Sequence, residues 1–208
     1  MPAKQEIKRK VLITGASGLL GSALVNEFAS QGFDVLGQYR YHRPPSPKIG
    51  NCVPLPGDFS DLTGIRAFLQ WNQAHFAGCG VLINNYGPII YKDITALRGE
   101  DFCRDYFQNV VPAFEITDYF LKHFHLQVVV NIGFEYTGEV RPYQKILTYA
   151  AAKNALQLIT VSFEKSYPDI RFVMIPVPTL AGATVPAAHK TDVLPATVAK
   201  EIYQRVNL

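Results

Sequence analysis

The sequence predicts an α/β fold in which a doubly wound parallel sheet carries helices on both of its faces. Short segments of almost uninterrupted apolar residues, such as residues 128–130, are typical of strands that are buried on both sides. Longer segments with apolar residues at helical spacing separate these strands, and this alternation is typical of parallel strands joined by helical crossovers. With 208 residues, 48% of them hydrophobic, the chain is long enough to form one domain with a complete core.

The first predicted strand, residues 11–13, leads through a glycine-rich turn into a helix that begins near Gly18. Gly15 allows a tight turn, Gly18 lets backbone N–H groups approach an anion, and Gly21 lets the helix lie close to the strand. The helix N-terminus adds free N–H donors and a partial positive charge, which suit a pyrophosphate group. The spacing is Gly-x-x-Gly-x-x-Gly rather than the usual dinucleotide-binding Gly-x-Gly-x-x-Gly, so an ordinary strand-to-helix turn is the alternative.

The next elements are marked by residues that end helices or form loops. A glycine stops the first helix before the second strand, which is expected at 33–39. The proline-rich segment 41–50 is predicted to be a loop, and a short strand follows at 52–55. The helix expected at 60–76 opens with a serine and an aspartate that can cap it, and its apolar residues share one face.

The second half of the chain repeats the alternation of strands and helices. Three more strands are expected, at 81–83, 127–132 and 171–177. Three more helices are expected, at 100–124, 146–167 and 195–206. Ligands of such sheets bind beyond the carboxyl ends of the strands, and each motif described below falls at one of those ends.

Composition and charge exclude several classes of protein. A net charge of +3, dispersed along the chain, provides no surface for nucleic acid, and the five histidines form no metal-binding pattern. No apolar segment reaches membrane-spanning length, and no signal peptide precedes the first strand. Cys52, Cys79 and Cys103 lack paired spacing, which favours a reducing compartment. We therefore expect a soluble cytoplasmic protein that uses no metal and binds neither nucleic acid nor a membrane.

Several motifs occur in a fixed order along the chain. Residues 84–87 read Asn-Asn-Tyr-Gly, residues 149–153 read Tyr-Ala-Ala-Ala-Lys, Asp58 follows the third strand, and Asn109 lies in the helix after residue 100. Together with the glycine turn, these motifs resemble those of the short-chain dehydrogenase/reductase family over nearly the whole chain. The resemblance implies a single Rossmann-type domain over residues 1–208. It also implies a set of cofactor-binding residues, which are Gly15, Ser17, Gly18, Leu20, Gly21, Arg40, Asp58, Phe59, Asn85, Gly87 and Lys153.

Tyr149 and Lys153 are spaced for acid–base chemistry, because residues four apart on a helix share a face. A phenol titrates near 10 in water. A nearby ammonium group favours the phenolate, so we expect Lys153 to lower the pKa of Tyr149 into a useful range. The resemblance implies that Tyr149 is the proton donor in the reductive direction, that Lys153 also holds the nicotinamide ribose, and that Asn109 supports a proton-relay water. An exposed Tyr–Lys helix pair without function is the alternative.

Two departures from the family pattern bear directly on the predicted active site. Where the family places a serine that binds the substrate carbonyl, this chain has Phe134, and a small shift in alignment would bring Glu135, Tyr136 or Thr137 there instead. Pteridine-type reductases of the family work on C=N bonds without this serine. Tyr86 replaces a small alanine beside the cofactor, where it could narrow the site, stack on a flat substrate, or simply fill the core.

The end of the second strand predicts the cofactor. An acidic residue there would bind the ribose hydroxyl groups of NAD, but the sequence is Gln-Tyr-Arg. Arg40 and Arg43 are available to a 2′-phosphate, for which the guanidinium group is well suited. NADP(H) is therefore expected in preference to NAD(H).

Three functions are consistent with these features. The first is an NAD(P)-dependent oxidoreductase that transfers a hydride between NADPH and a small carbonyl or imine compound, for example a pterin-like one. The second is a catalytically weak or inactive NADP(H)-binding regulatory protein, and the third is a scaffold. The presence of Tyr149, Lys153 and Asn109 together favours the enzyme. The family and the large apolar residues of helices 100–124 and 146–167 also predict a homodimer or homotetramer.

Overall fold

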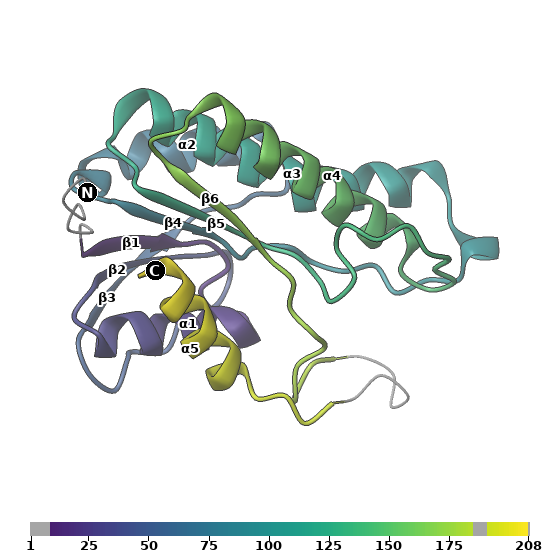
Figure 1. Cartoon of the computed structure of the whole chain (residues 1–208), viewed down its shortest axis with the longest axis horizontal. Coiled ribbons are helices and arrows are strands. Elements are labelled where there is room, and N and C mark those ends of the chain that lie inside the picture. The colour runs from purple at the N-terminus through teal and green to yellow at the C-terminus, as the bar shows by residue number, and fades with distance from the viewer. Residues whose placement is uncertain (1–8, 185–190, 208) are drawn as a thin grey trace.

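The computed structural model describes residues 9–184 and 191–207, and its centre is a six-stranded parallel sheet (Figure 1). The strands are β1 (Lys10–Ile13), β2 (Asp34–Tyr39), β3 (Asn51–Pro56), β4 (Val81–Asn84), β5 (Val128–Ile132) and β6 (Arg171–Ile175). They are arranged in the order β3-β2-β1-β4-β5-β6, and every neighbouring pair is parallel. The order reverses between β1 and β4, which is where an open parallel sheet forms a crevice for a ligand. The predicted doubly wound sheet is confirmed.

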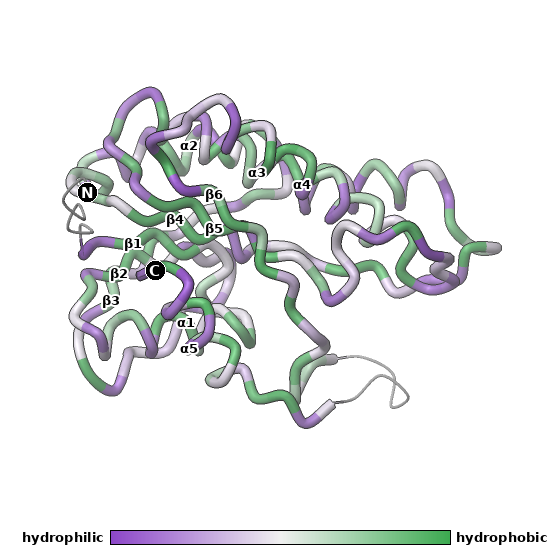
Figure 2. Tube along the Cα trace, in the orientation of Figure 1, coloured by the Kyte–Doolittle hydropathy of each residue, from purple (hydrophilic) through white to green (hydrophobic). Residues whose placement is uncertain are grey.

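Helices cover both faces of the sheet (Figure 1). One layer consists of α1 (Leu19–Ser30) and α5 (Pro195–Val206), and the other of α2 (Leu62–Trp71), α3 (Gly99–His123) and α4 (Leu147–Ser166). Side chains alternate along each strand, so Val11 and Ile13 join the core under α1 and α5, whereas Leu12 joins the core under α2 and α3. The strands at the centre of the sheet are largely hydrophobic in Figure 2, as burial on both faces requires.

The observed strands begin and end within two residues of the predicted positions, but the helix predicted over 60–76 is interrupted. The helix α2 ends at Trp71, and a 3₁₀ turn (Gln73–Phe76) follows Asn72. The Asn72 side chain donates a hydrogen bond to the carbonyl oxygen of Phe68 at 2.8 Å, which satisfies the end of the helix. The turn then buries Phe76 completely, with its ring centroid 4.8 Å from that of Phe120.

Two smaller differences also have local causes. The last strand ends at Ile175 rather than 177, because Pro176 has no N–H group to donate to a ladder. A 3₁₀ turn that was not predicted (Ile94–Ala96) is capped by the Asp93 side chain, which accepts from the backbone N–H of Thr95 at 3.0 Å.

Large apolar side chains are exposed on α3 and α4. Phe102 and Phe114 of α3 are 44% and 41% exposed, and Leu158 of α4 is 66% exposed. In contrast, Leu156, one of the large apolar residues in the helix predicted at 146–167, is 1% exposed and belongs to the core. Within 9–184 and 191–207, no helix is long and apolar enough to cross a membrane.

Candidate active site

The glycine turn after β1 has the close packing that its residues predict. Gly15 has a positive φ of 64°, which disfavours other residues. A Cβ atom at Gly21 would lie 2.1 Å from the carbonyl oxygen of Gly15, so any side chain there would push α1 off the turn. Gly18 precedes the first residue of α1, and no side chain caps the helix. The N–H groups of the first helical turn are therefore free to bind an anion.

Asn85 and Gln38 hold this turn in place from the neighbouring strands. The Asn85 side chain donates to the carbonyl oxygens of Thr14 and Gly15 at 2.9 and 3.1 Å. The Gln38 side chain accepts from the N–H of Gly15 at 2.8 Å and donates to the carbonyl oxygen of Gly57 at 2.7 Å. Sequence reasoning missed Gln38, although a polar residue inside an apolar strand was the available signal.

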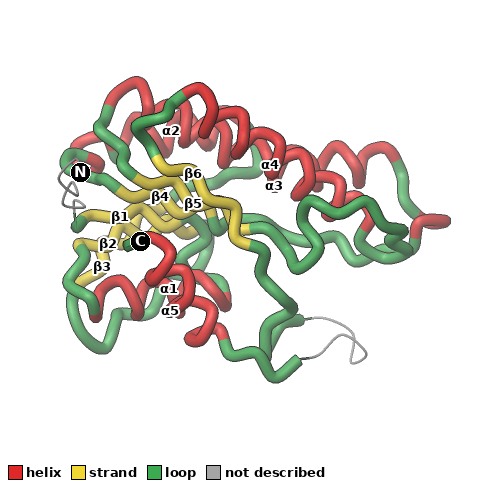
Figure 3. The backbone as a smooth tube through the Cα atoms, in the orientation of Figure 1, coloured by secondary structure: helices red, strands yellow, loops and turns green. Residues whose placement is uncertain are grey.

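A pocket of about 370 Å³ opens at the carboxyl ends of β1, β2 and β4, the edge from which the loops emerge in Figure 3. Its lining includes most of the predicted cofactor-binding residues, which are Gly15, Ser17, Gly18, Leu20, Gly21, Arg40, Asn85 and Gly87. Asp58, Phe59 and Lys153 do not line this pocket. Phe59 is completely buried, with its ring centroid 5.5 Å from that of Tyr86, so its side chain supports the pocket wall instead of forming it.

Arg40 connects the pocket to Asp58. Its guanidinium group forms an ion pair with the Asp58 carboxylate at 3.0 Å and lies over the ring of Tyr41, 4.5 Å from the centroid. Burial favours a higher pKa for Asp58, but hydrogen bonds from Ser60 and the charge of Arg40 outweigh it and lower the pKa. Arg43, the other predicted phosphate ligand, is exposed and is not part of the pocket lining.

Tyr86 lies at the same end of the pocket. It is half-buried, and burial raises its pKa while the charge of Arg40 opposes this effect. The structure thus places Tyr86 between the core residue Phe59 and the Arg40–Asp58 pair, where it both fills the core and forms part of the pocket wall.

Tyr149 and Lys153 lie together on α4, with the Lys153 ammonium nitrogen 5.5 Å from the centre of the Tyr149 ring. Lys153 is only 2% exposed, and its Nζ donates to the carbonyl oxygen of Ile132 at 2.8 Å. Burial lowers the pKa of Lys153 to about 8. Burial and the charge of Asp105 raise the pKa of Tyr149, which is opposite to the predicted direction. The reason is desolvation, which the sequence does not reveal, and it favours the neutral phenol.

Asn109 faces Lys153 across Gly87. The Asn109 Nδ2 donates to the carbonyl oxygens of Pro88 and Asp105 at 2.8 and 3.0 Å, whereas its buried Oδ1 has no hydrogen-bond partner among the residues that the structure describes. A Cβ atom at Gly87 would lie 2.6 Å from this Oδ1 and 2.9 Å from the Lys153 Nζ. These polar atoms therefore border one small space, which only glycine leaves open and which suits a bridging water.

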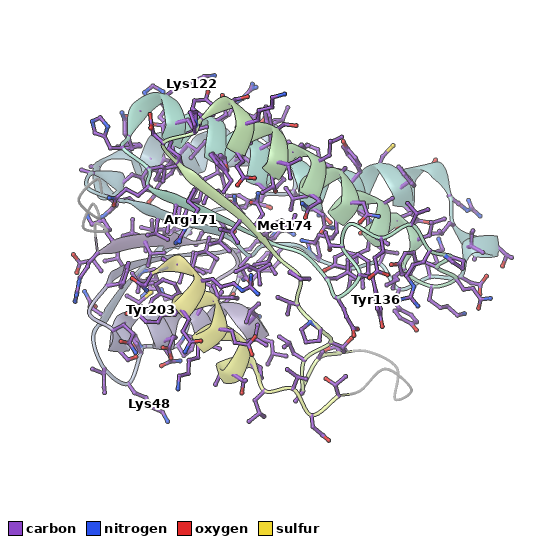
Figure 4. All side chains as sticks on the ribbon, viewed as in Figure 1. Lys48, Lys122, Tyr136, Arg171, Met174 and Tyr203 are labelled. Carbon is purple, nitrogen blue, oxygen red and sulfur yellow. The ribbon has the colours of Figure 1, made fainter. Side chains whose placement is uncertain are left out.

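Phe134, the first of the four residues expected near the family's serine position, packs edge-on against Tyr149 with ring centroids 5.7 Å apart. The other three candidates are placed differently. Glu135 is exposed, and Tyr136, which is labelled in Figure 4, has the Arg141 guanidinium group over its ring. The Thr137 hydroxyl accepts from the backbone N–H of Phe134 at 2.8 Å. In the described parts of the chain, no group of three or more His, Cys, Asp or Glu residues is arranged so that it could hold a metal ion.

Comparisons with known proteins agree with this geometry. A family model described as short chain dehydrogenase matches residues 9–193. The 3beta-hydroxysteroid dehydrogenase 1 of Eggerthella lenta is 22% identical over 173 residues, which is 77% of this chain and 66% of that protein. Elsinochrome reductase 1 of Elsinoe fawcettii is 20% identical over 205 residues, or 95% of this chain and 74% of that protein. The chain thus spans just under two thirds of the first of these relatives.

Solved structures share the fold. Landomycin C-6 ketoreductase, determined with bound NADP and rabelomycin, superposes with a TM-score of 0.78 at 17% identity and covers 95% of this chain and 88% of its own. A metagenomic short-chain oxidoreductase in complex with NADP has a TM-score of 0.73 at 19% identity and covers 96% of this chain and 91% of its own. The match of the family model over most of the chain, together with the site geometry, shows that the chain belongs to the short-chain dehydrogenase family of oxidoreductases.

Proposed function

We propose that this protein is an NADPH-dependent reductase of a small carbonyl or imine compound. The observation that carries the proposal is the meeting of Tyr149, Lys153 and Asn109 around Gly87, directly beside the pocket formed by the glycine turn. A scaffold would not need this arrangement, and an inactive NADP(H)-binding protein would need only the pocket.

The residues of the pocket fit a nicotinamide dinucleotide. The uncapped N-terminus of α1 would hold the pyrophosphate, and Arg40 and Asp58 would hold the adenosine end. Lys153 would hold the nicotinamide ribose, as the family resemblance implies. When bound, the nicotinamide supplies the hydride for reduction.

Tyr149 would deliver the proton. Since its raised pKa keeps it neutral, its hydroxyl group is in the form that donates a proton to the oxygen or nitrogen of the C=O or C=N bond, while the carbon of that bond accepts the hydride. The Lys153 ammonium group, with a pKa of about 8, would be mostly charged at neutral pH and would stabilise the phenolate that donation leaves. Asn109 would then position a water that returns a proton through Lys153.

The preference for NADP(H) over NAD(H) rests on Arg40, which follows β2 and lines the pocket, and on the end of β2, where Gln38 and Tyr39 stand in place of an acidic residue. Arg40 already forms an ion pair with Asp58, so its guanidinium group would contact both the Asp58 carboxylate and the 2′-phosphate. A guanidinium group has enough N–H donors for two such contacts. The NADP bound to the landomycin ketoreductase and to the metagenomic enzyme supports this cofactor class.

The substrate is proposed to be small and to need no serine hydroxyl group, because Phe134 occupies the side of Tyr149. A C=N compound such as a dihydropterin meets this condition. The loss of NADPH absorbance with a panel of ketones, aldehydes and dihydropterins tests the proposal. Turnover of one member that Tyr149→Phe abolishes is expected, whereas tight NADPH binding with no turnover of any member would favour the regulatory protein.

We also propose that residues 1–208 form one domain. The exposed faces of α3 and α4 are proposed to form a homodimer or homotetramer, and the protein is proposed to be cytoplasmic. The assembly is supported by the exposure of Phe102, Phe114 and Leu158. The location is supported by the three cysteines, all of which are free thiols.

A further inference from the structure

Asp105 is a completely buried carboxyl group that the proposed reaction does not use. It lies on α3, one helical turn before Asn109, at a position that faces α4. From Val110 to Phe120 the buried positions of α3 are mainly apolar, for example Ala113 and Ile116. No Lys, Arg or His within the described residues lies at ion-pair distance from its carboxylate. Burial of an unpaired carboxylate is costly, so packing alone does not explain this residue.

The contacts of Asp105 lead to the proposed catalytic residues. Its Oδ2 accepts a hydrogen bond from the Thr148 hydroxyl group at 2.6 Å, and Thr148 directly precedes Tyr149 in the first turn of α4. Its backbone carbonyl oxygen accepts from the Asn109 side chain at 3.0 Å. Asp105 therefore joins the helix that carries Asn109 to the helix that carries Tyr149 and Lys153.

We propose that Asp105 is a positioning residue for the proton donor: its carboxylate fixes Thr148 and the first turn of α4, and its negative charge acts on the hydroxyl group of Tyr149. This inference rests on the proposed function of Tyr149. It adds to the site a charged group that neither the family motifs nor the pocket lining contains.

The charge acts in a defined direction. Burial raises the pKa of Asp105, while the Thr148 hydroxyl, the Ile90 N–H and the charge of Arg104 favour its ionised form. When ionised, Asp105 adds to the effect of burial and raises the pKa of Tyr149. Lys153 is the cation on the same face of α4, with its Nζ 5.5 Å from the centre of the Tyr149 ring.

The other charged groups nearby have partners elsewhere. Lys92 and Arg104 pair with Asp101, on the turn of α3 before Asp105. In the loop after β5, the Arg141 guanidinium group lies over the rings of Tyr136 and Tyr143 and within 3.9 Å of the Glu139 carboxylate. Asp105 is thus the charged group that raises the pKa of Tyr149, and Lys153 is the cation beside the Tyr149 ring.

The variant Asp105→Asn tests the charge, since asparagine keeps the size of the side chain and an oxygen for Thr148. Without the negative charge the pKa of Tyr149 falls, so the pH profiles of kcat/KM move to lower pH by about one unit. The two directions of the reaction then change oppositely. The rate of reduction falls at a lower pH than in the wild-type protein, whereas the rate of oxidation, which needs the phenolate, increases near neutral pH. Asp118→Asn, a surface charge on the same helix, should change neither profile.

A purely structural role would give another result. If Asp105→Asn lowered both directions equally and left the midpoints of the pH profiles in place, the proposal would be overturned. Thr148→Val tests the positioning contact, and we expect a lower kcat with little change in the KM for NADPH. Thr148→Ser should restore the rate, because serine keeps the hydroxyl group, and a failure of this rescue counts against the proposal.

The effect of Asp105 on Tyr149 can also be measured in the absence of a substrate. If the wild-type protein reduced none of the tested substrates, the proposed function would fail on its own. The titration of phenolate absorbance would then measure Tyr149 directly, by subtraction of the Tyr149→Phe curve. A lower midpoint in Asp105→Asn supports the coupling of the two groups, and an unchanged midpoint refutes it.

Discussion

Replacement of Lys153 by methionine should stabilise the cofactor-free protein while it abolishes turnover. Burial lowers the pKa of Lys153 from 10.5 to about 8, and the unfolded chain would regain the ordinary value. Each unit of difference corresponds to about 1.4 kcal/mol, so the buried charge costs about 3 kcal/mol at neutral pH. Methionine removes this cost and fills a similar volume, but it leaves the carbonyl oxygen of Ile132 without its donor, a loss of about 1 kcal/mol. The expected net gain is about 2 kcal/mol.

The pH dependence provides the sharper test. Because the pKa is lower in the folded state, the unfolded chain binds the proton more tightly, and the penalty is fully present below about 8. As the pH rises from about 8 to 10.5, the wild-type protein loses the penalty and its stability relative to Lys153→Met increases. Urea unfolding followed by circular dichroism, without cofactor, measures this difference. Lys122→Met, which removes an exposed lysine, is the matched control and should show no such recovery. A Lys153→Met protein that is less stable than wild type at every pH, by a constant amount, would refute the reasoning.

Four further outcomes are expected. Tyr149→Phe should lower kcat by about 10²–10⁴-fold and leave NADPH affinity nearly unchanged, as measured by steady-state kinetics and fluorescence titration. Arg40→Ala should weaken NADPH binding more than NADH binding, and an equal loss for both would contradict the assignment of the 2′-phosphate. Gly87→Ala should abolish most activity, because its Cβ would enter the space between Asn109 and Lys153, and full activity would show that this space is not used. Leu158→Glu should convert the oligomer to a monomer in light scattering, and a wild-type monomer at micromolar concentration would refute the assembly.

The sequence by itself determined the fold class and the approximate position of every strand. Apolar segments such as residues 128–130 of β5 are typical of strands buried on both faces, and the regular alternation with helices leaves a parallel sheet as the consistent arrangement. The glycine turn was also readable, because Gly15 and Gly21 are required by backbone conformation and close approach, which are local properties. The order of the motifs, through the family resemblance, also predicted that Tyr149, Lys153 and Asn109 belong to one site.

Only the tertiary structure decided the electrostatics of the site. The pKa of Tyr149 is raised instead of lowered, since desolvation depends on all the segments that cover the residue and not on the four-residue spacing to Lys153. The pairing of Arg40 with Asp58, the support of the glycine turn by Gln38, and the contact of Asp105 with Thr148 join residues far apart in the chain. Such contacts leave no periodic signal in the sequence, because a single polar residue in an apolar segment is equally compatible with a solvated surface. These side chains form one site only when the helices pack on the sheet, because this packing buries them and brings them into contact.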